Sequence, residues 1–167
     1  MRPHRKQQSN ANAGFTLIEV LITLVIFSIG LLGLAALQAN SMVNSHNAYL
    51  RSQATLMAND MADRMRANMV GVADNRYNAL NGIPVNPNCI TDIAGCTPAQ
   101  IAIFDAFEWN TTLNAELPSG AGTVTGNSAD FIITVRWDER RNGAIGTGCD
   151  PADADDLQCI AVSLTLL

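Results

Sequence analysis

The chain has 167 residues, and its 10 lysine and arginine residues against 15 aspartate and glutamate residues give a formal net charge of −5 at pH 7. This length allows one domain with a helical extension and leaves no room for two domains. The acidic balance excludes the electrostatic footprint of a nucleic-acid-binding protein. No nucleophile–base pair, Walker loop or dinucleotide fingerprint occurs in the sequence, so we expect neither an enzyme nor a cofactor.

The chain begins with a short basic leader followed by a long apolar run. Residues 1–14 hold three basic residues and no acidic one, and the run from Val20 to Leu37 has only four positions that are not hydrophobic. With Phe15 included, the run is about long enough to cross a bilayer. Basic residues favour the cytoplasmic side, so we expect the rest of the chain to lie beyond the inner membrane.

Glu19 is the one charged residue at the start of this apolar run. A carboxylate in a membrane-length helix is costly unless it is paired, so such residues are functional candidates. The alternative is that Glu19 only extends to the headgroup region. A conventional secretory signal is disfavoured, because the small-residue site Ala11-Asn12-Ala13 precedes the apolar run and does not follow it.

The basic leader, the sequence Gly14-Phe15-Thr16-Leu17-Ile18-Glu19 and the apolar helix together resemble the processing site of type IV prepilins and pseudopilins. The resemblance implies that a prepilin peptidase cleaves between Gly14 and Phe15 and methylates the new N-terminus at Phe15. It implies an assembly role for Glu19, whose carboxylate can pair with the cationic amine of a neighbouring subunit and so favour a defined register.

We expect the helix to continue beyond the membrane. From Asn40 to about Asn68 the sequence contains no proline or glycine and becomes polar. Apolar residues spaced by three and four predict one buried stripe along this helix: Leu50, Ala54, Met57, Met61, Met65 and Met69. The methionines are expected to pack in a core, because methionine fills irregular gaps.

The run from Tyr49 to Asn68 narrows the resemblance to the type IV pilus modification proteins, the V-type minor pilins. Further marks of that family are Asp105 and Trp109 on a helix, the turn Leu117-Pro118-x-Gly120 and a strand that ends Val135-x-Trp137. For four charged residues of the long helix, spacing and the resemblance lead to different predictions: Asp60, Asp63, Arg64 and Arg66. Spacing alone predicts a solvated helix face for them, whereas the resemblance implies contacts of the head domain and no catalysis.

After Gly71 the sequence is punctuated by turn residues, and a second helix then follows. Thr97 can cap this helix, Pro98 suits its first position and Gln100 completes a capping box. A short strand is expected at Gly122–Thr125. Alternation predicts a strand at Phe131–Trp137, with Phe131, Ile133, Val135 and Trp137 on one face, and a last strand at Cys159–Leu166. The fold class is therefore α+β and pilin-like: a long N-terminal helix packed on a small antiparallel sheet.

Four cysteines in a small exported head predict two disulfides. Of the three pairings, Cys89–Cys96 with Cys149–Cys159 is the simplest, since each bond closes a short loop and contributes about 2–3 kcal/mol. Zinc is disfavoured, because neither a C-x-x-C spacing nor a nearby histidine is present.

Four aspartates lie in the loop from Asp150 to Asp156. They can gather around calcium, but the full EF-hand pattern is missing. We therefore favour an acidic, solvated loop and expect no metal.

These observations predict a leader at residues 1–14, a hydrophobic transmembrane and assembly helix at 15–39, and a periplasmic head at 40–167. Removal of the three basic residues of the leader changes the formal charge from −5 to −8. The resemblance implies a single-pass inner-membrane protein that becomes a minor type IV pilin at the pilus base or tip and helps to initiate assembly. Its implied partners are the prepilin peptidase, other minor pilins, the major pilin and a tip adhesin.

Two alternatives stay open at this point. A minor pseudopilin of a type II secretion system would share the whole N-terminal half. A membrane-tethered periplasmic binding protein would keep its helix in the bilayer, and an unprocessed N-terminus would favour that alternative.

Overall fold

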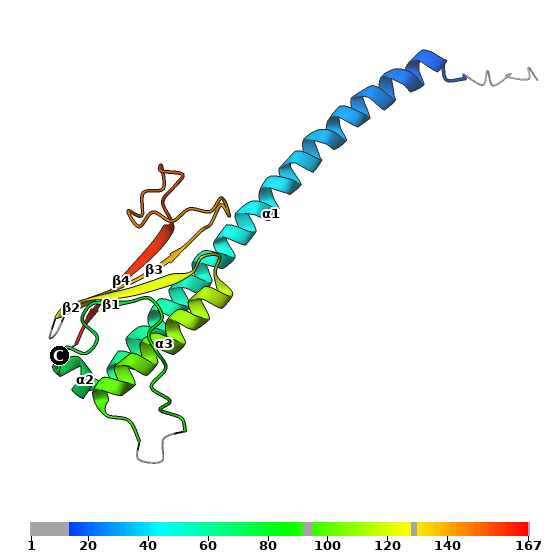
Figure 1. The fold of residues 1–167 in the computed structure, drawn as a ribbon. Coiled ribbons are helices and arrows are strands. Elements are labelled where there is room, and N and C mark those ends of the chain that lie inside the picture. The colour runs from blue at the N-terminus through cyan, green and yellow to red at the C-terminus, as the bar shows by residue number, and fades with distance from the viewer. Residues whose placement is uncertain (1–13, 92–94, 128–129, 167) are drawn as a thin grey trace, which may run out of the picture. The chain divides into compact units, whose positions relative to one another are not determined.

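The computed structural model describes residues 14–91, 95–127 and 130–166. Within them the elements follow in the order α1 (Leu17–Ala67), α2 (Met69–Ala73), β1 (Leu80–Asn81), α3 (Pro98–Glu116), β2 (Ala121–Asn127), β3 (Asp130–Trp137) and β4 (Gln158–Thr165) (Figure 1). The chain divides into two compact units, Met1–Asn44 and Ser45–Leu167. All of the predicted leader except Gly14 lies outside the described residues.

The described part of the first unit is the N-terminal part of α1, whose apolar side chains are exposed. Two hydroxyl groups in this run bond within the helix: Thr23 Oγ1 donates to the Val20 carbonyl at 2.8 Å, and Ser28 Oγ donates to the Leu24 carbonyl at 2.7 Å. Because both hydroxyl groups are bonded within the helix, neither would lack a hydrogen-bond partner in an apolar environment. By length and composition, α1 can cross a membrane.

In the second unit, α1 buries one stripe of side chains. Its members are Leu50, Ala54, Ala58, Met61, Ala62 and Met65. Four of these were predicted, while Ala58 and Ala62 allow other elements to approach the helix closely. The prediction for Met69 was wrong: α1 ends at Ala67, Met69 begins the short helix α2, and its side chain is 42% exposed.

The sheet is an antiparallel meander with strand order β1-β2-β3-β4. As predicted, the β3 side chains of Phe131, Ile133, Val135 and Trp137 point to one side and are buried. The strand β2 is longer than predicted, and the two-residue strand β1 was not predicted. The strand β1 follows from pairing, because Leu80 and Asn81 lie opposite Val124 and Thr123 of β2. The extra length of β2 follows from its pairing with β3, from Ala121 opposite Arg136 to Asn127 opposite Asp130.

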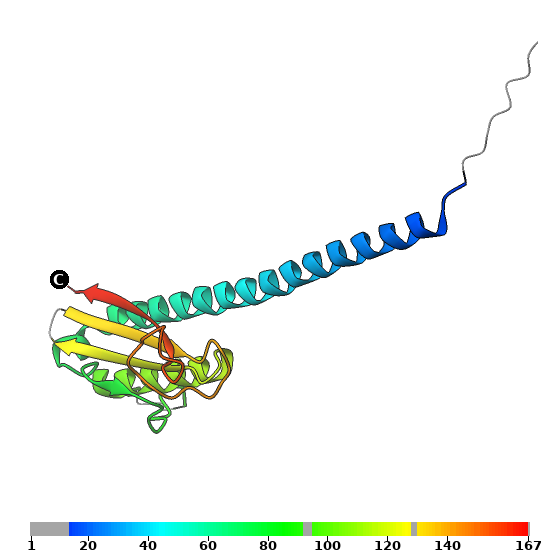
Figure 2. The same cartoon turned by 90° about the horizontal axis from the view of Figure 1, so that it is seen from above.

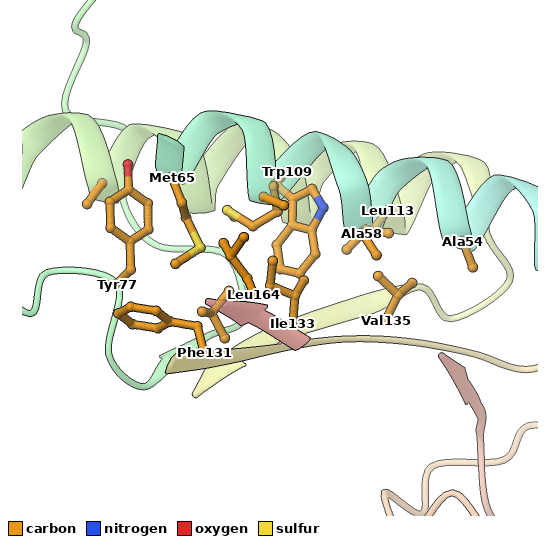
Figure 3. Packing of buried hydrophobic residues seen from close by; sticks show 14 of the residues in the cluster. Ala54, Ala58, Met65, Tyr77, Trp109, Leu113, Phe131, Ile133, Val135 and Leu164 are labelled. Carbon is orange, nitrogen blue, oxygen red and sulfur yellow. The ribbon is translucent and has the colours of Figure 1, made fainter. Parts of the chain in front are cut away.

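The core lies between one face of the sheet and the two helices α1 and α3. Figure 3 shows Ala58 and Met65 of α1 and Trp109 and Leu113 of α3 above the strand residues Phe131, Ile133, Val135 and Leu164. The helix α3 begins with the predicted capping box: Thr97 Oγ1 accepts the Gln100 N–H, and the Gln100 side chain accepts the Thr97 N–H. This cap fixes the start of α3 and hence the position of Trp109.

Two disulfides close two short loops of the second unit. Cys89 is bonded to Cys96 before α3, with a Cα–Cα distance of 5.4 Å, and Cys149 is bonded to Cys159 at the start of β4, with a Cα–Cα distance of 5.6 Å. The second bond tethers the acidic loop between β3 and β4.

The carboxylates of this acidic loop bond to its own backbone. Asp156 accepts N–H groups from Gly148 and Asp150, each at 3.1 Å, while Asp150 and Asp153 accept N–H groups two residues further on. In the described parts of the chain, no three histidine, cysteine or acidic residues are placed to hold a metal ion.

Candidate functional site

The segment around the expected cleavage point precedes α1 and is accessible. Gly14, Phe15 and Thr16 have no helical conformation, and the Phe15 side chain is 83% exposed. A Cβ atom at Gly14 would meet no other atom within 4 Å. Among the described residues, nothing covers the Gly14–Phe15 peptide bond, so it is accessible to an enzyme.

Glu19 lies in the first turn of α1, where a negative charge is favourable beside the positive end of the helix dipole. Its N–H group donates to the Thr16 carbonyl at 3.1 Å and lies 3.4 Å from Thr16 Oγ1. The spacing Thr16-x-x-Glu19 is that of a capping box, a local signal that our sequence analysis missed. The exposed Glu19 side chain projects from a capped helix end.

A second candidate region is a group of polar side chains between α1, the segment after α2 and α3. We call it the Arg64 cluster, and it consists of Asp60, Arg64, Asn68, Tyr77, Asp105 and Glu108. The Arg64 guanidinium donates to Asp60 at 2.8 Å and to Glu108 at 2.9 Å, and it lies 3.5 Å from Asp105. One cation thereby joins α1 to two carboxylates of α3.

The buried end of the Arg64 cluster is a chain of hydrogen bonds. The Tyr77 hydroxyl donates to Asp105, and the Asn68 amide donates to the Tyr77 oxygen at 3.1 Å and to the Pro98 carbonyl at 2.8 Å. Tyr77 is fully buried, and the side chains of Asp105 and Arg64 are 10% and 27% exposed. The Asn68 side-chain oxygen Oδ1 also accepts the Gly71 N–H and so caps α2.

These contacts change the proton affinity of two groups. Burial raises the pKa of Tyr77 above its ordinary value of 10.0, and the hydrogen bond to Asp105 raises it further. Burial alone would lower the pKa of Arg64, but the bonds to Glu108 and Asp60 outweigh burial and raise it. Tyr77 is therefore neutral and Arg64 charged over the physiological pH range, and their bonds hold α1, α3 and the segment after α2 together.

The structure separates the four charged residues of α1 that the sequence analysis considered together. Asp60 and Arg64 belong to the Arg64 cluster, whereas Asp63 and Arg66 form an exposed i,i+3 pair at 2.6 Å. The solvated helix face expected from spacing therefore describes Asp63, Arg66 and the exposed Asp60, which pairs with Arg64 at i,i+4, whereas Arg64 also reaches α3. Asn68, Tyr77 and Glu108 were missed, because no periodicity links positions on three separate segments.

The other residues of the V-type resemblance lie further along α3 and after it. Trp109 Nε1 donates to the Met57 carbonyl of α1 at 2.8 Å, and the Asp138 N–H, directly after β3, donates to the Pro118 carbonyl at 2.7 Å. A Cβ atom at Gly122 would lie 2.3 Å from the Trp109 ring. Each contact fixes one element of the head against another, so these residues have packing roles.

One line of apolar side chains on α1 is not covered by the core. Tyr49 and Leu56, both in the second unit, are exposed. Because they are seven residues apart, they lie on nearly the same face of a helix. This line is suited to contact with another helix.

The comparisons with known proteins agree with these observations. Residues 36–107 match the family model of type IV pilin Tt1218, and residues 9–35 match the prokaryotic N-terminal methylation motif. The comparisons with curated proteins and with solved structures give no match. The methylation motif covers Gly14 to Glu19, and the pilin match extends from α1 to Asp105 and Phe107 of α3. The motif implies processing by a prepilin peptidase and assembly with other pilins.

Proposed function

We propose that this chain, which carries a type IV pilin domain and a prepilin methylation motif, is a minor pilin that helps to initiate pilus assembly from the inner membrane. Type IV pilins are structural proteins and not enzymes. We assign residues 1–14 to the leader, 15–39 to the transmembrane and assembly helix and 40–167 to the periplasmic head. The observation that carries the proposal is an exposed Gly14–Phe15 bond directly before a capped, apolar helix with Glu19 in its first turn.

Cleavage at this bond changes the electrostatics of the helix start. The new amine at Phe15 is a cation beside the positive end of the α1 dipole, an unfavourable position. Glu19 offers a carboxylate in the same turn. We propose that Glu19 pairs with the methylated amine of a neighbouring subunit, because a buried pair of this kind specifies register between packed helices.

Release from the membrane is reasonable for this helix, because a bundle of similar helices replaces lipid around the same apolar surface. In the second unit, the exposed Tyr49 and Leu56 offer apolar side chains for contact with another helix. Major pilins often carry a proline further along the helix, and Ala35 and Ala36 occupy that region here. Only Gly30 and Gly33 weaken the helix, which fits a scarce initiating subunit better than a repeated shaft subunit.

The test is the number of pili and the amount of this chain in them. We compare Glu19→Ala with Glu116→Ala, which removes an exposed carboxylate at the end of α3. Glu19→Ala is expected to reduce the number of pili seen by electron microscopy, while Glu116→Ala is expected to leave it unchanged. Quantitative mass spectrometry of sheared pili is expected to find this chain far below the major subunit.

The outcomes separate the alternatives. Normal pili with lost protein secretion would favour a pseudopilin of a type II secretion system. A chain absent from pili that retains its leader in the membrane would favour a tethered binding protein. A chain as abundant in pili as the major subunit would contradict the minor-pilin assignment.

A further inference from the structure

The described part of the chain begins with three residues that α1 does not include. Gly14, Phe15 and Thr16 have no helical conformation, and α1 starts at Leu17. Figure 2 shows this short stretch, in dark blue, as an uncoiled segment before the first turn of the helix. Only Phe15 and Thr16 therefore separate the proposed cleavage point from the helix.

Thr16 is the N-cap residue of α1. Its carbonyl accepts the Glu19 N–H at 3.1 Å and the Val20 N–H at 3.3 Å, which are the first main-chain bonds of the helix. Its hydroxyl oxygen accepts the same Glu19 N–H at 3.4 Å. Threonine is a preferred N-cap residue, because its hydroxyl satisfies an N–H group that the helix leaves without a carbonyl partner. In a longer helix, that partner would be the Phe15 carbonyl.

Apart from this cap, little in the sequence prevents α1 from starting earlier. Residues 4–14 include no proline, and they contain two alanines, the strongest helix former. Gly14 lowers the helix propensity, but glycine is about as good an N-cap residue as threonine. A helix that loses its cap at Thr16 can therefore start at Phe15, with Gly14 as the new cap.

An earlier start would occupy the carbonyl group that a peptidase has to attack. In a helix, the carbonyl of residue i accepts the N–H of residue i+4, so the Gly14 carbonyl would accept the Ile18 N–H. In the described part of the chain, the Gly14 carbonyl accepts no main-chain hydrogen bond. A peptidase needs this oxygen free, because groups of the enzyme must stabilise the charge that develops on it during the reaction.

Loss of the cap could unwind the first turn of α1 instead of extending the helix. Extension is favoured in apolar surroundings, because unwinding there would leave main-chain groups without water to bond them. The first two side chains of α1, Leu17 and Ile18, are apolar and 79% and 65% exposed. Lipid or detergent around them therefore favours the longer helix.

We propose that Thr16 is a positioning residue for removal of the leader. By capping α1 it keeps the Gly14–Phe15 bond outside the helix and the Gly14 carbonyl free. In the cleavage, water adds across this amide bond, so that Gly14 keeps the new carboxylate and Phe15 the new amine. The role of Thr16 rests on the proposed function, because it requires that a prepilin peptidase cleaves the chain at this bond.

The test uses the full chain in detergent with a purified prepilin peptidase, and the rate of cleavage is measured by mass spectrometry. Thr16→Ala removes the cap, whereas Thr16→Asn changes the shape of the side chain and keeps a strong cap. We expect kcat/KM to fall about fivefold for Thr16→Ala and to stay within about twofold of the original value for Thr16→Asn.

Thr23→Ala is the matched control. Thr23 Oγ1 donates to the Val20 carbonyl at 2.8 Å in the same helix, but it does not cap the helix. This variant loses the same hydroxyl group and is expected to keep the original kcat/KM.

The start of α1 is measured separately, without peptidase, by amide hydrogen exchange resolved to single residues. In Thr16→Ala the Ile18 amide is expected to exchange about fivefold more slowly than in the original chain, because it gains the Gly14 carbonyl as an acceptor. In Thr16→Asn its exchange is expected to be unchanged.

Three outcomes would overturn the role of Thr16. Equal losses of kcat/KM for Thr16→Asn and Thr16→Ala would mean that the peptidase recognises threonine itself. An unchanged kcat/KM for Thr16→Ala would mean that cleavage does not depend on the cap. Faster exchange of the Ile18 amide in Thr16→Ala would mean that the first turn unwinds.

Failure of the proposed function has a different signature. In that case the peptidase does not cleave the original chain at Gly14–Phe15, and the role of Thr16 in cleavage fails with it. Cleavage of the original chain with any of the three outcomes above contradicts the role of Thr16 alone and leaves the pilin proposal standing.

Discussion

Burial, and not the length of an ion pair, should decide which acidic residue of the head matters for stability. Asp63 and Asp105 provide the comparison, because each lies in a helix and each faces an arginine. Asp63 is 2.6 Å from Arg66 with its side chain 73% exposed, whereas Asp105 is 3.5 Å from Arg64 with its side chain 10% exposed. The shorter pair is the one that water screens.

The magnitudes follow from the partners that each substitution leaves behind. Asp105→Ala removes the acceptor of the fully buried Tyr77 hydroxyl, and an unsatisfied buried hydroxyl costs about 1–3 kcal/mol. Arg64 keeps Glu108 and Asp60, so the larger penalty for an unpaired buried charge is avoided. We expect a loss of about 2–3 kcal/mol. Asp63→Ala removes only an exposed pair and should change stability by less than about 0.5 kcal/mol.

The assay is urea unfolding of the full chain in detergent, followed by tryptophan fluorescence. Trp109 and Trp137 are both buried in the head, so their emission reports the loss of the core. The gain in helix propensity from aspartate to alanine is the same for both variants and cancels in the comparison. Equal losses for Asp63→Ala and Asp105→Ala would refute the reasoning, as would a loss below about 0.5 kcal/mol for Asp105→Ala.

Three further outcomes are expected in the same unfolding assay. The pKa of Tyr77 is raised in the folded state, so above pH 10 the folded chain keeps the Tyr77 proton while the unfolded chain loses it. The free energy of unfolding therefore falls as pH rises above 10, and Tyr77→Phe removes this part of its pH dependence. Gly122→Ala places a Cβ atom against the Trp109 ring and should cost about 2 kcal/mol or more, with a shift in tryptophan emission. Replacing Cys149 and Cys159 together by serine should lower the unfolding free energy by about 2–3 kcal/mol, and an unchanged midpoint would contradict the structural role of that bond.

The parts of the fold that local chemistry determines were predictable from the sequence. Thr97 caps α3, and Pro98 and Gln100 follow it in the first turn. The four residues 97–100 are therefore enough to predict where α3 begins. Alternation in β3 gave the buried face correctly, because a strand with one face on the core repeats every two residues. Similarly, the motif from Gly14 to Glu19 depends on neighbouring residues only.

The parts that long-range contacts determine were not predictable in this way. The apolar spacing that included Met69 fails because Asn68 ends the stripe: its side chain caps α2 and bonds to Tyr77 and the Pro98 carbonyl. The strand β1 exists only through its pairing with β2. In the Arg64 cluster, Arg64 pairs with Asp105 and Glu108 of α3, which lie 41 and 44 positions further along the chain. No local sequence pattern indicates a pairing over such a separation.

The central claim is that this chain is a processed pilin, and analysis of its N-terminus from native membranes tests that claim most directly. Intact-mass and N-terminal measurements, made without reduction and with thiol alkylation, report the first residue and the state of the four cysteines. The account predicts a chain that begins at N-methylated Phe15 with no alkylated thiol. A chain that retains residues 1–14, or that begins after Leu37, would contradict it.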